Sequence, residues 1–144
     1  MSKWKIVLDT NVILSAVFPT SKYQPILRGL ANDIYDVFVT TEIMLEYEEK
    51  LTSIFGQKTS DKFMELCNTL PNVIPTEIYY RWQLIYADPD DDKFVDCAVA
   101  ANAHFLVTDD RHYKILKNIP FPTLKVIRID EFLSMVNLAQ LKNG

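Results

Sequence analysis

The sequence has few of the residues that mark linkers, disulfide frameworks or membrane spans. It contains three glycines, seven prolines and no Ser/Gly-rich or repeated stretch, which excludes a repeat array and an obvious linker. No apolar run is long enough to cross a bilayer, and the opening segment becomes charged too early for a secretory signal. We therefore expect residues 1–144 to form a single domain without membrane association, frayed only from about Leu138 onward.

Cysteine is also scarce, and the acidic residues outnumber the basic ones by 19 to 15. Cys67 and Cys97 are the two cysteines, and both have apolar neighbours in helical patterns, which predicts buried thiols and a reducing, cytoplasmic location. The net charge of −4 argues against a broad basic surface for nucleic acid. That argument weakens if the acids gather in one pocket, because a bound cation then reverses the local field.

Short apolar runs alternate with helical patterns along the chain. Strands are expected at 5–8, 34–40, 73–74, 105–108 and 125–129. Helices are expected from after Asp9 to about 32, from Thr40-Thr41 to 55, from Thr59 or Ser60 to 70, from Asp88-Pro89 to about 102, and from a cap at Asp130. The segment 78–86 has no clear pattern. Alternation of this kind predicts an α/β fold with three layers, doubly wound around a mostly parallel sheet.

Four carboxylates should meet at one edge of that sheet. In a doubly wound fold the residues just after each strand, and those early in the next helix, share the carboxyl edge. Asp9 and Asp110 follow strands, whereas Glu46 and Asp91 lie early in helices. Helical phase favours Asp91 over its close rival Asp90, and it predicts that Asp96 points to solvent.

Such a group of acids predicts a bound cation. Like charges brought together repel and cost stability unless a metal neutralises them. Oxygen ligands select hard ions, Mg²⁺ or Mn²⁺, which can activate water and stabilise in-line displacement at phosphorus. Singly, each acid has an ordinary explanation as a strand end, turn, helix cap or surface ion pair; their coincidence at one edge favours a metal site.

The residues around these acids resemble the PIN domain family, in particular the toxin components of toxin–antitoxin systems. The resemblance covers nearly the whole chain and is carried by 8–12 (LDTNV), Glu46-Tyr47, 88–98 (DPDDDKFVDCA) and 106–110 (LVTDD).

The resemblance also implies individual roles. The metal-binding and catalytic acids of the family fall on Asp9, Glu46, Asp91 and Asp110. Asn11 and Thr108 fall on positions that support the site. The family usually has glycine where this chain has Asp109, which leaves Asp109 and Asp110 open as alternatives.

The implied activity is Mg²⁺- or Mn²⁺-dependent endonucleolytic cleavage of single-stranded RNA, leaving a 5′-phosphate and a 3′-hydroxyl. A protein antitoxin and a homodimer are implied as well. Arg111 and Lys114 follow the site and could contact the RNA backbone, although a solvated helix face explains them equally. His112 is expected to be a surface or partly buried side chain, and a contact with phosphate, suggested by its place near Asp110, is the less favoured alternative.

Two other functions compete. A haloacid-type phosphohydrolase would also place aspartate after the first strand, but it needs a second aspartate at the position of Asn11. A catalytically inactive acidic pocket that binds Mg²⁺ or a protein partner stays open as the non-enzymatic alternative.

Overall fold

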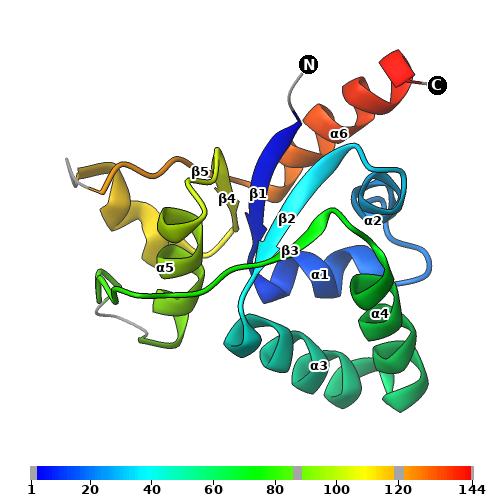
Figure 1. Ribbon diagram of the computed structural model, residues 1–144. Coiled ribbons are helices and arrows are strands. Elements are labelled where there is room, and N and C mark those ends of the chain that lie inside the picture. The colour runs from blue at the N-terminus through cyan, green and yellow to red at the C-terminus, as the bar shows by residue number, and fades with distance from the viewer. Residues whose placement is uncertain (1–2, 86–88, 119–121, 144) are drawn as a thin grey trace.

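A computed structural model describes residues 3–85, 89–118 and 122–143 (Figure 1). The strands are β1 (Trp4–Leu8), β2 (Tyr35–Val39), β3 (Val73–Pro75), β4 (Phe105–Val107) and β5 (Val126–Ile127). The α-helices are α1 (Thr10–Val17), α2 (Gln24–Ala31), α3 (Thr41–Phe55), α4 (Gln57–Thr69), α5 (Asp92–Ala100) and α6 (Ile129–Asn143). Two 3₁₀ helices are present in the described residues, η1 (Pro89–Asp91) and η2 (Arg111–Asn118).

The five strands form one parallel sheet in the order β3-β2-β1-β4-β5. The chain moves outward from β1 to β3 on one side and returns to β4 on the other, so the direction of winding reverses between β1 and β4. Leu8 pairs with Val107 at the carboxyl end of these two strands. This reversal is the position where doubly wound sheets bind their ligands, and the predicted α/β class is confirmed.

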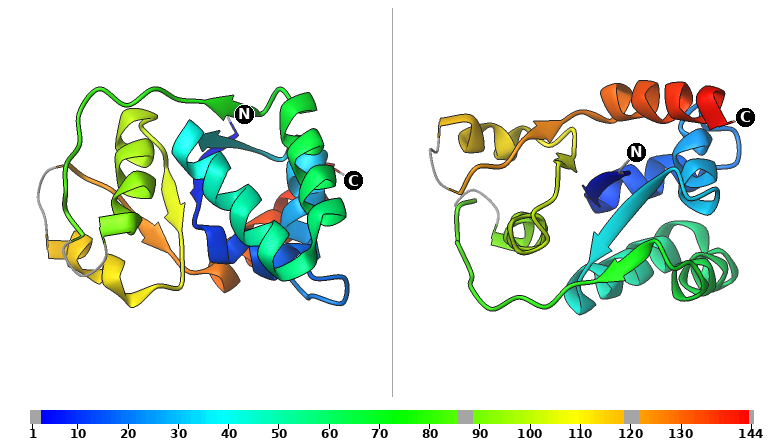
Figure 2. Two further views of the ribbon diagram at one scale, coloured as in Figure 1. Left: turned by 90° about the horizontal axis from the view of Figure 1, so that it is seen from below. Right: turned by 45° about the horizontal axis from the view of Figure 1, so that its top comes forward.

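Helices cover both faces of the sheet, because strands buried on both sides need apolar cover above and below. Figure 2 shows α2 and α6 together on one side, with α3, α4 and α5 on the other. Ile6, Val7 and Leu8 of β1 are fully buried between these layers. Both cysteines are buried free thiols, as expected, and burial raises the pKa of each to about 12. Neither thiol is therefore activated as a nucleophile.

The first helical stretch is broken in two. Phe18 precedes Pro19 and has extended backbone, at φ −56° and ψ 127°, because proline disfavours helical geometry in the residue before it. The predicted cap of α4 at Thr59 or Ser60 is wrong, since the helix begins at Gln57. Gly56 makes the sharp turn from α3 at φ +94°, a conformation that favours glycine. Thr40 does cap α3, with its Oγ1 accepting from the Ile43 N–H.

The last helix also differs from expectation. Asp130 does not cap it; Asp130 accepts from the Tyr23 hydroxyl, and the first N–H of α6, on Ile129, donates to Asp109 at 3.0 Å. The helix continues through Asn143, so the predicted fraying from Leu138 is wrong. The predicted helix start at Asp88 lies outside the described residues. Among the residues described, no helix is long and apolar enough to cross a membrane.

Candidate metal centre

Asp9 lies at the carboxyl end of β1, at the point where the winding of the sheet reverses. Its N–H donates to the carbonyl of Val107 in β4, which fixes the backbone, and its side chain is almost fully buried. The Thr108 hydroxyl donates to Asp9 Oδ2 at 2.6 Å and accepts from the Asp110 N–H at 3.0 Å. Thr108 therefore links the acid after β1 to the acid after β4.

Asp91, Asp110 and His112 form a compact cluster beside this link. One potential ligand atom from each lies within 4.8 Å of the other two. His112 Nδ1 is 3.4 Å from Asp91 Oδ2 and 3.2 Å from Asp110 Oδ1. The His112 N–H also donates to Asp110 Oδ1 at 2.8 Å, so the turn that orients this carboxylate orients the imidazole as well.

Tyr113 holds the two halves of the cluster together. Its ring is fully buried, and its hydroxyl donates to the backbone carbonyl of Asp91 at 3.1 Å. Because Tyr113 follows His112 directly, η2 is fastened to the start of α5 at the place where the imidazole reaches the Asp91 carboxylate. The separation of the two acids is thus set by a core contact rather than by exposed loop residues.

Glu46 is engaged by other groups. The Thr10 hydroxyl donates to its Oε2, and Lys93 Nζ lies 2.8 Å from its Oε1. Lys93 is mostly buried and also donates to the carbonyl of Asp90 at 2.6 Å. The structure therefore brings Glu46 next to Asp9 through Thr10, but both carboxylate oxygens already have a partner. Sequence reasoning missed Thr10 and Lys93, although both stand within the motifs around Asp9 and Asp91.

The remaining candidates lie at the margins of the site. Asp90 is exposed, and Asp109 faces away, where it receives the Ile129 N–H and lies 3.4 Å from Arg128. Asn11 is exposed on α1, and no hydrogen bond joins it to Asp9 in the described part of the chain. Arg111 and Lys114 are exposed on η2, next to the cluster in sequence.

The sequence matches the model of a known protein family over most of its length. The model of a PIN domain family matches residues 5–112, which is more than half of the chain and spans all four predicted acids. The chain belongs to the PIN domain family. No curated protein matches it.

Solved structures share the fold of this PIN domain at low sequence identity. VapBC2 from Rickettsia felis, bound to a DNA fragment from its promoter, gives a TM-score of 0.60 at 18% identity, covering 86% of this chain and 98% of the other. DNA-bound VapBC from Salmonella typhimurium gives a TM-score of 0.58 at 11% identity, covering 88% of this chain and 98% of the other. The T. brucei RRP44 PIN domain gives a TM-score of 0.56 at 15% identity, covering 98% of this chain and 85% of the other.

An irregular strap, residues 78–85, crosses α5 beside the metal centre. The Trp82 N–H donates to Asp96 at 2.9 Å, and the Ile85 N–H donates to Asp92 at 2.8 Å. Asp96 is therefore buried, and the prediction that it points to solvent is wrong. A segment without its own ladder of hydrogen bonds needs acceptors elsewhere, and two aspartates one turn apart on α5 supply them.

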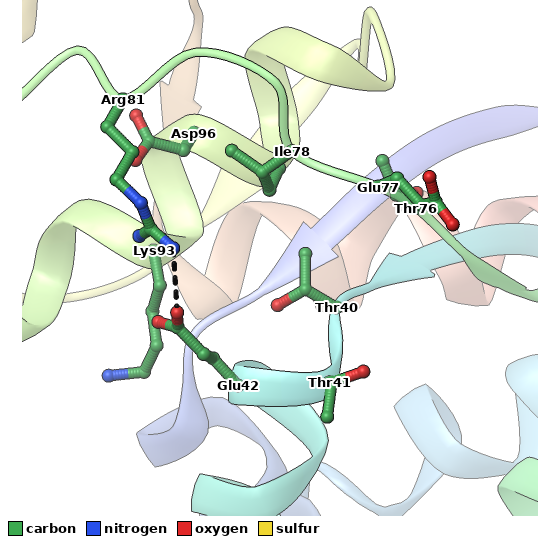
Figure 3. A pocket seen from close by; sticks show the side chains of 9 residues that line it. All are labelled: Thr40, Thr41, Glu42, Thr76, Glu77, Ile78, Arg81, Lys93 and Asp96. Atoms are coloured by element: carbon green, nitrogen blue, oxygen red, sulfur yellow. Dashed lines mark hydrogen bonds and ion pairs between the residues drawn. The ribbon is translucent and has the colours of Figure 1, made fainter.

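A pocket of about 310 Å³ lies between the strap and the start of α3 (Figure 3). Arg81 reaches across the pocket to Glu42 at 3.0 Å. Lys93 also lines the pocket, and its Nζ pairs with Glu46. The lining carries acids as well as these two cations. The pocket therefore has no single sign of charge that would select an anion.

The surroundings of Asp9 disfavour its charged form. Burial raises its pKa above the ordinary value, and the charges of Asp110 and Glu46 raise it further, while hydrogen bonds from Thr108 and Thr10 oppose the rise. Burying a carboxylate near two others is unfavourable in the free protein. A divalent cation would remove that cost, and the oxygen donors of Asp9, Asp91 and Asp110 suit such an ion. The residues present therefore fit a metal centre.

Proposed function

We propose that this PIN domain is a metal-dependent endoribonuclease that cuts single-stranded RNA and acts as the toxin of a toxin–antitoxin pair. The observation that carries the proposal is the cluster of Asp91, Asp110 and His112, which Thr108 links to Asp9 where the winding of a PIN-family sheet reverses. PIN domains are generally nucleases, and hydrolysis of a phosphodiester needs both an activated water and neutralisation of the charge on the phosphate.

The chain supplies the groups that such a reaction needs. Asp9, Asp91 and Asp110 would hold Mg²⁺ or Mn²⁺, and Glu46 would complete the set if it left Lys93. The bound ion would supply a nucleophilic water at neutral pH and positive charge for the phosphate. Thr108 keeps Asp9 oriented, and Asn11 remains a proposed supporting residue. Lys93 is placed to neutralise Glu46 or to approach the phosphate when Glu46 is displaced.

RNA would approach over the exposed side of η2. Arg111 and Lys114 present two cations there, next to Asp110, and would contact the backbone phosphates. The products would carry a 5′-phosphate and a 3′-hydroxyl. Two of the solved structures that share the fold are VapBC assemblies, and FitAcB from Neisseria gonorrhoeae shares it at a TM-score of 0.55 and 17% identity, covering 86% of this chain and 97% of the other. On this likeness we propose a protein antitoxin partner. A homodimer, which the family resemblance implies, and a cytoplasmic location, which the two free buried cysteines favour, remain further proposals.

The test is cleavage of end-labelled RNA by purified full-length protein freed of copurifying partners. A single-stranded RNA and a hairpin of the same composition are incubated with Mg²⁺, Mn²⁺ or EDTA. Asp9→Asn removes the central carboxylate, and Asp61→Asn is the matched control, because Asp61 is exposed on α4 away from the site. We expect cleavage of the single strand that EDTA and Asp9→Asn abolish and that Asp61→Asn leaves intact.

The competing functions give different results. Folded protein that binds Mn²⁺ but cuts none of a varied set of RNAs would identify an inactive acidic module. Release of phosphate from a small phosphomonoester, with RNA untouched, would identify a phosphohydrolase. The structure gives that chemistry little support, because Asn11 stands where its second aspartate is needed and is exposed on α1.

A further inference from the structure

His112 lies in the acidic cluster, although the family resemblance gives a metal-binding role only to four acids and not to this histidine. The chain has two histidines, and they lie at opposite ends of β4. His104 precedes the strand, where its Nδ1 accepts from the Lys5 N–H at 2.8 Å. His112 follows the strand, at the carboxyl edge, with its Nδ1 between the carboxylates of Asp91 and Asp110.

We propose that His112 is a nitrogen ligand of the metal in this centre, completing a ligand set with Asp91 and Asp110. The inference rests on the proposed function, because it refines the metal centre on which that function depends. It makes the centre a mixed nitrogen and oxygen site rather than an all-oxygen site.

The distances fit shared coordination. An octahedral ion with bonds of about 2.1 Å places neighbouring ligand atoms about 3.0 Å apart. Nδ1 lies 3.2 Å from Asp110 Oδ1 and 3.4 Å from Asp91 Oδ2, so small movements of three side chains would bring them into contact with one ion. The imidazole side chain is 35% exposed, which leaves it open to an ion arriving from solvent.

The imidazole is also held in place before any ion binds. The His112 N–H is fixed by Asp110, and the neighbouring Tyr113 is fixed by the Asp91 carbonyl. Ligands that are already oriented lose less conformational freedom on binding. The hydrogen bonds of these two neighbouring residues therefore hold the imidazole beside both acids.

A nitrogen ligand changes which ion the centre prefers. Imidazole suits first-row transition ions, whereas Mg²⁺ prefers oxygen donors and water. We therefore expect the centre to bind Mn²⁺ more tightly than Mg²⁺, with His112 responsible for part of the difference. Replacing His112 should weaken Mn²⁺ binding by at least about tenfold, the lower end of the losses seen when metal-site partners are removed. Mg²⁺ affinity should change by less than about threefold.

The experiment is pulsed electron paramagnetic resonance of Mn²⁺ bound to the full-length protein, which detects a nitrogen bonded to the ion. The decisive sample is His104→Gln protein labelled with ¹⁵N-histidine, because His112 is then its single histidine. We expect a ¹⁴N modulation in unlabelled protein that changes to the ¹⁵N pattern on labelling. His112→Gln should lose it. Equilibrium titration with Mn²⁺, and competition by Mg²⁺, give the two affinities.

Bound Mn²⁺ without histidine coupling, or coupling that survives His112→Gln, would overturn the inference. Failure of folded protein to bind Mn²⁺ would overturn it as well. The labelled His104→Gln sample keeps the test valid if His112→Gln does not fold. Parallel RNA cleavage separates the two proposals: cleavage without histidine coupling leaves the nuclease and removes the ligand, whereas coupling without cleavage leaves the ligand and removes the nuclease.

Discussion

Asp9→Asn should stabilise the metal-free protein and reduce the stability that the protein gains when Mg²⁺ or Mn²⁺ is added. Asp9 is almost fully buried, and burial raises its pKa, with Asp110 and Glu46 raising it further. Asparagine removes the charge and keeps an oxygen that can accept from Thr108. We expect the free energy of unfolding in EDTA at pH 7 to rise by about 1 kcal/mol, the usual size of a desolvation cost less one retained hydrogen bond. For a chain of this length the melting temperature should rise by about 3–5 °C.

The pH dependence has a definite sign. A carboxyl with a raised pKa binds its proton more tightly in the folded state, so the stability that comes from protonation is complete below the ordinary value of 3.8. That stability is lost as the pH rises through the higher folded pKa. The wild type therefore carries the full cost at pH 7, and the advantage of Asp9→Asn should shrink toward zero as the pH falls below about 4.

Metal should reverse the order of stability. An ion at ten times its dissociation constant stabilises the native state by about 1.4 kcal/mol, and the wild type should gain this with Mg²⁺ or Mn²⁺ while Asp9→Asn gains much less. Circular dichroism melts at pH 7 and pH 4, with EDTA or metal, measure both effects, and Asp61→Asn serves as the control. A lower melting temperature for Asp9→Asn in EDTA at pH 7, or an equal gain from metal, would refute the reasoning.

Three further variants test separate parts of the structure around the site. Asp109→Ala removes the acceptor for the first N–H of α6 and should lower the unfolding free energy by about 1 kcal/mol, measured in urea. RNA cleavage should be kept, and its loss would place Asp109 among the metal ligands. Arg111→Ala combined with Lys114→Ala should raise KM for RNA and leave kcat unchanged. The slope of log affinity against log salt concentration should become shallower by about 0.7 per lost phosphate contact. An unaltered slope would show that neither residue contacts the RNA backbone. Asp96→Ala removes the acceptor of the Trp82 N–H and should destabilise the protein by about 1–2 kcal/mol. Amide exchange should accelerate in residues 78–85, and unchanged exchange there would show that Asp96 does not hold the strap.

The sequence was most informative where local pattern decides structure. Continuous apolar runs predicted β1 and β4, and the rule that ligands gather at the carboxyl ends of parallel strands then placed Asp9 and Asp110 together. Thr40 was recognisable as a helix cap because capping depends on a few neighbouring residues. The family motifs were recognised for the same reason, since each is a short string of residues.

Contacts between distant segments could not be predicted in this way. Asp130 looked able to cap the last helix, and only the pairing of β4 with β5 brings Asp109 to the first N–H of α6 instead. Asp96 looked solvent-facing because helical phase does not reveal a strap that crosses the helix. The Lys93 contact with Glu46 joins α5 to α3 across the site, so no spacing along the chain encodes it.

The geometry of η2 would let one short segment serve the core, the proposed metal centre and the proposed RNA path together. A 3₁₀ helix has three residues per turn, so side chains at i and i+3 align while the two between them point elsewhere. Arg111 and Lys114 are such a pair, and both are exposed. Between them, His112 faces the acids and Tyr113 enters the core. A chain with a net charge of −4 therefore presents two cations beside its acidic cluster, because the period of η2 leaves Arg111 and Lys114 exposed while His112 faces the acids.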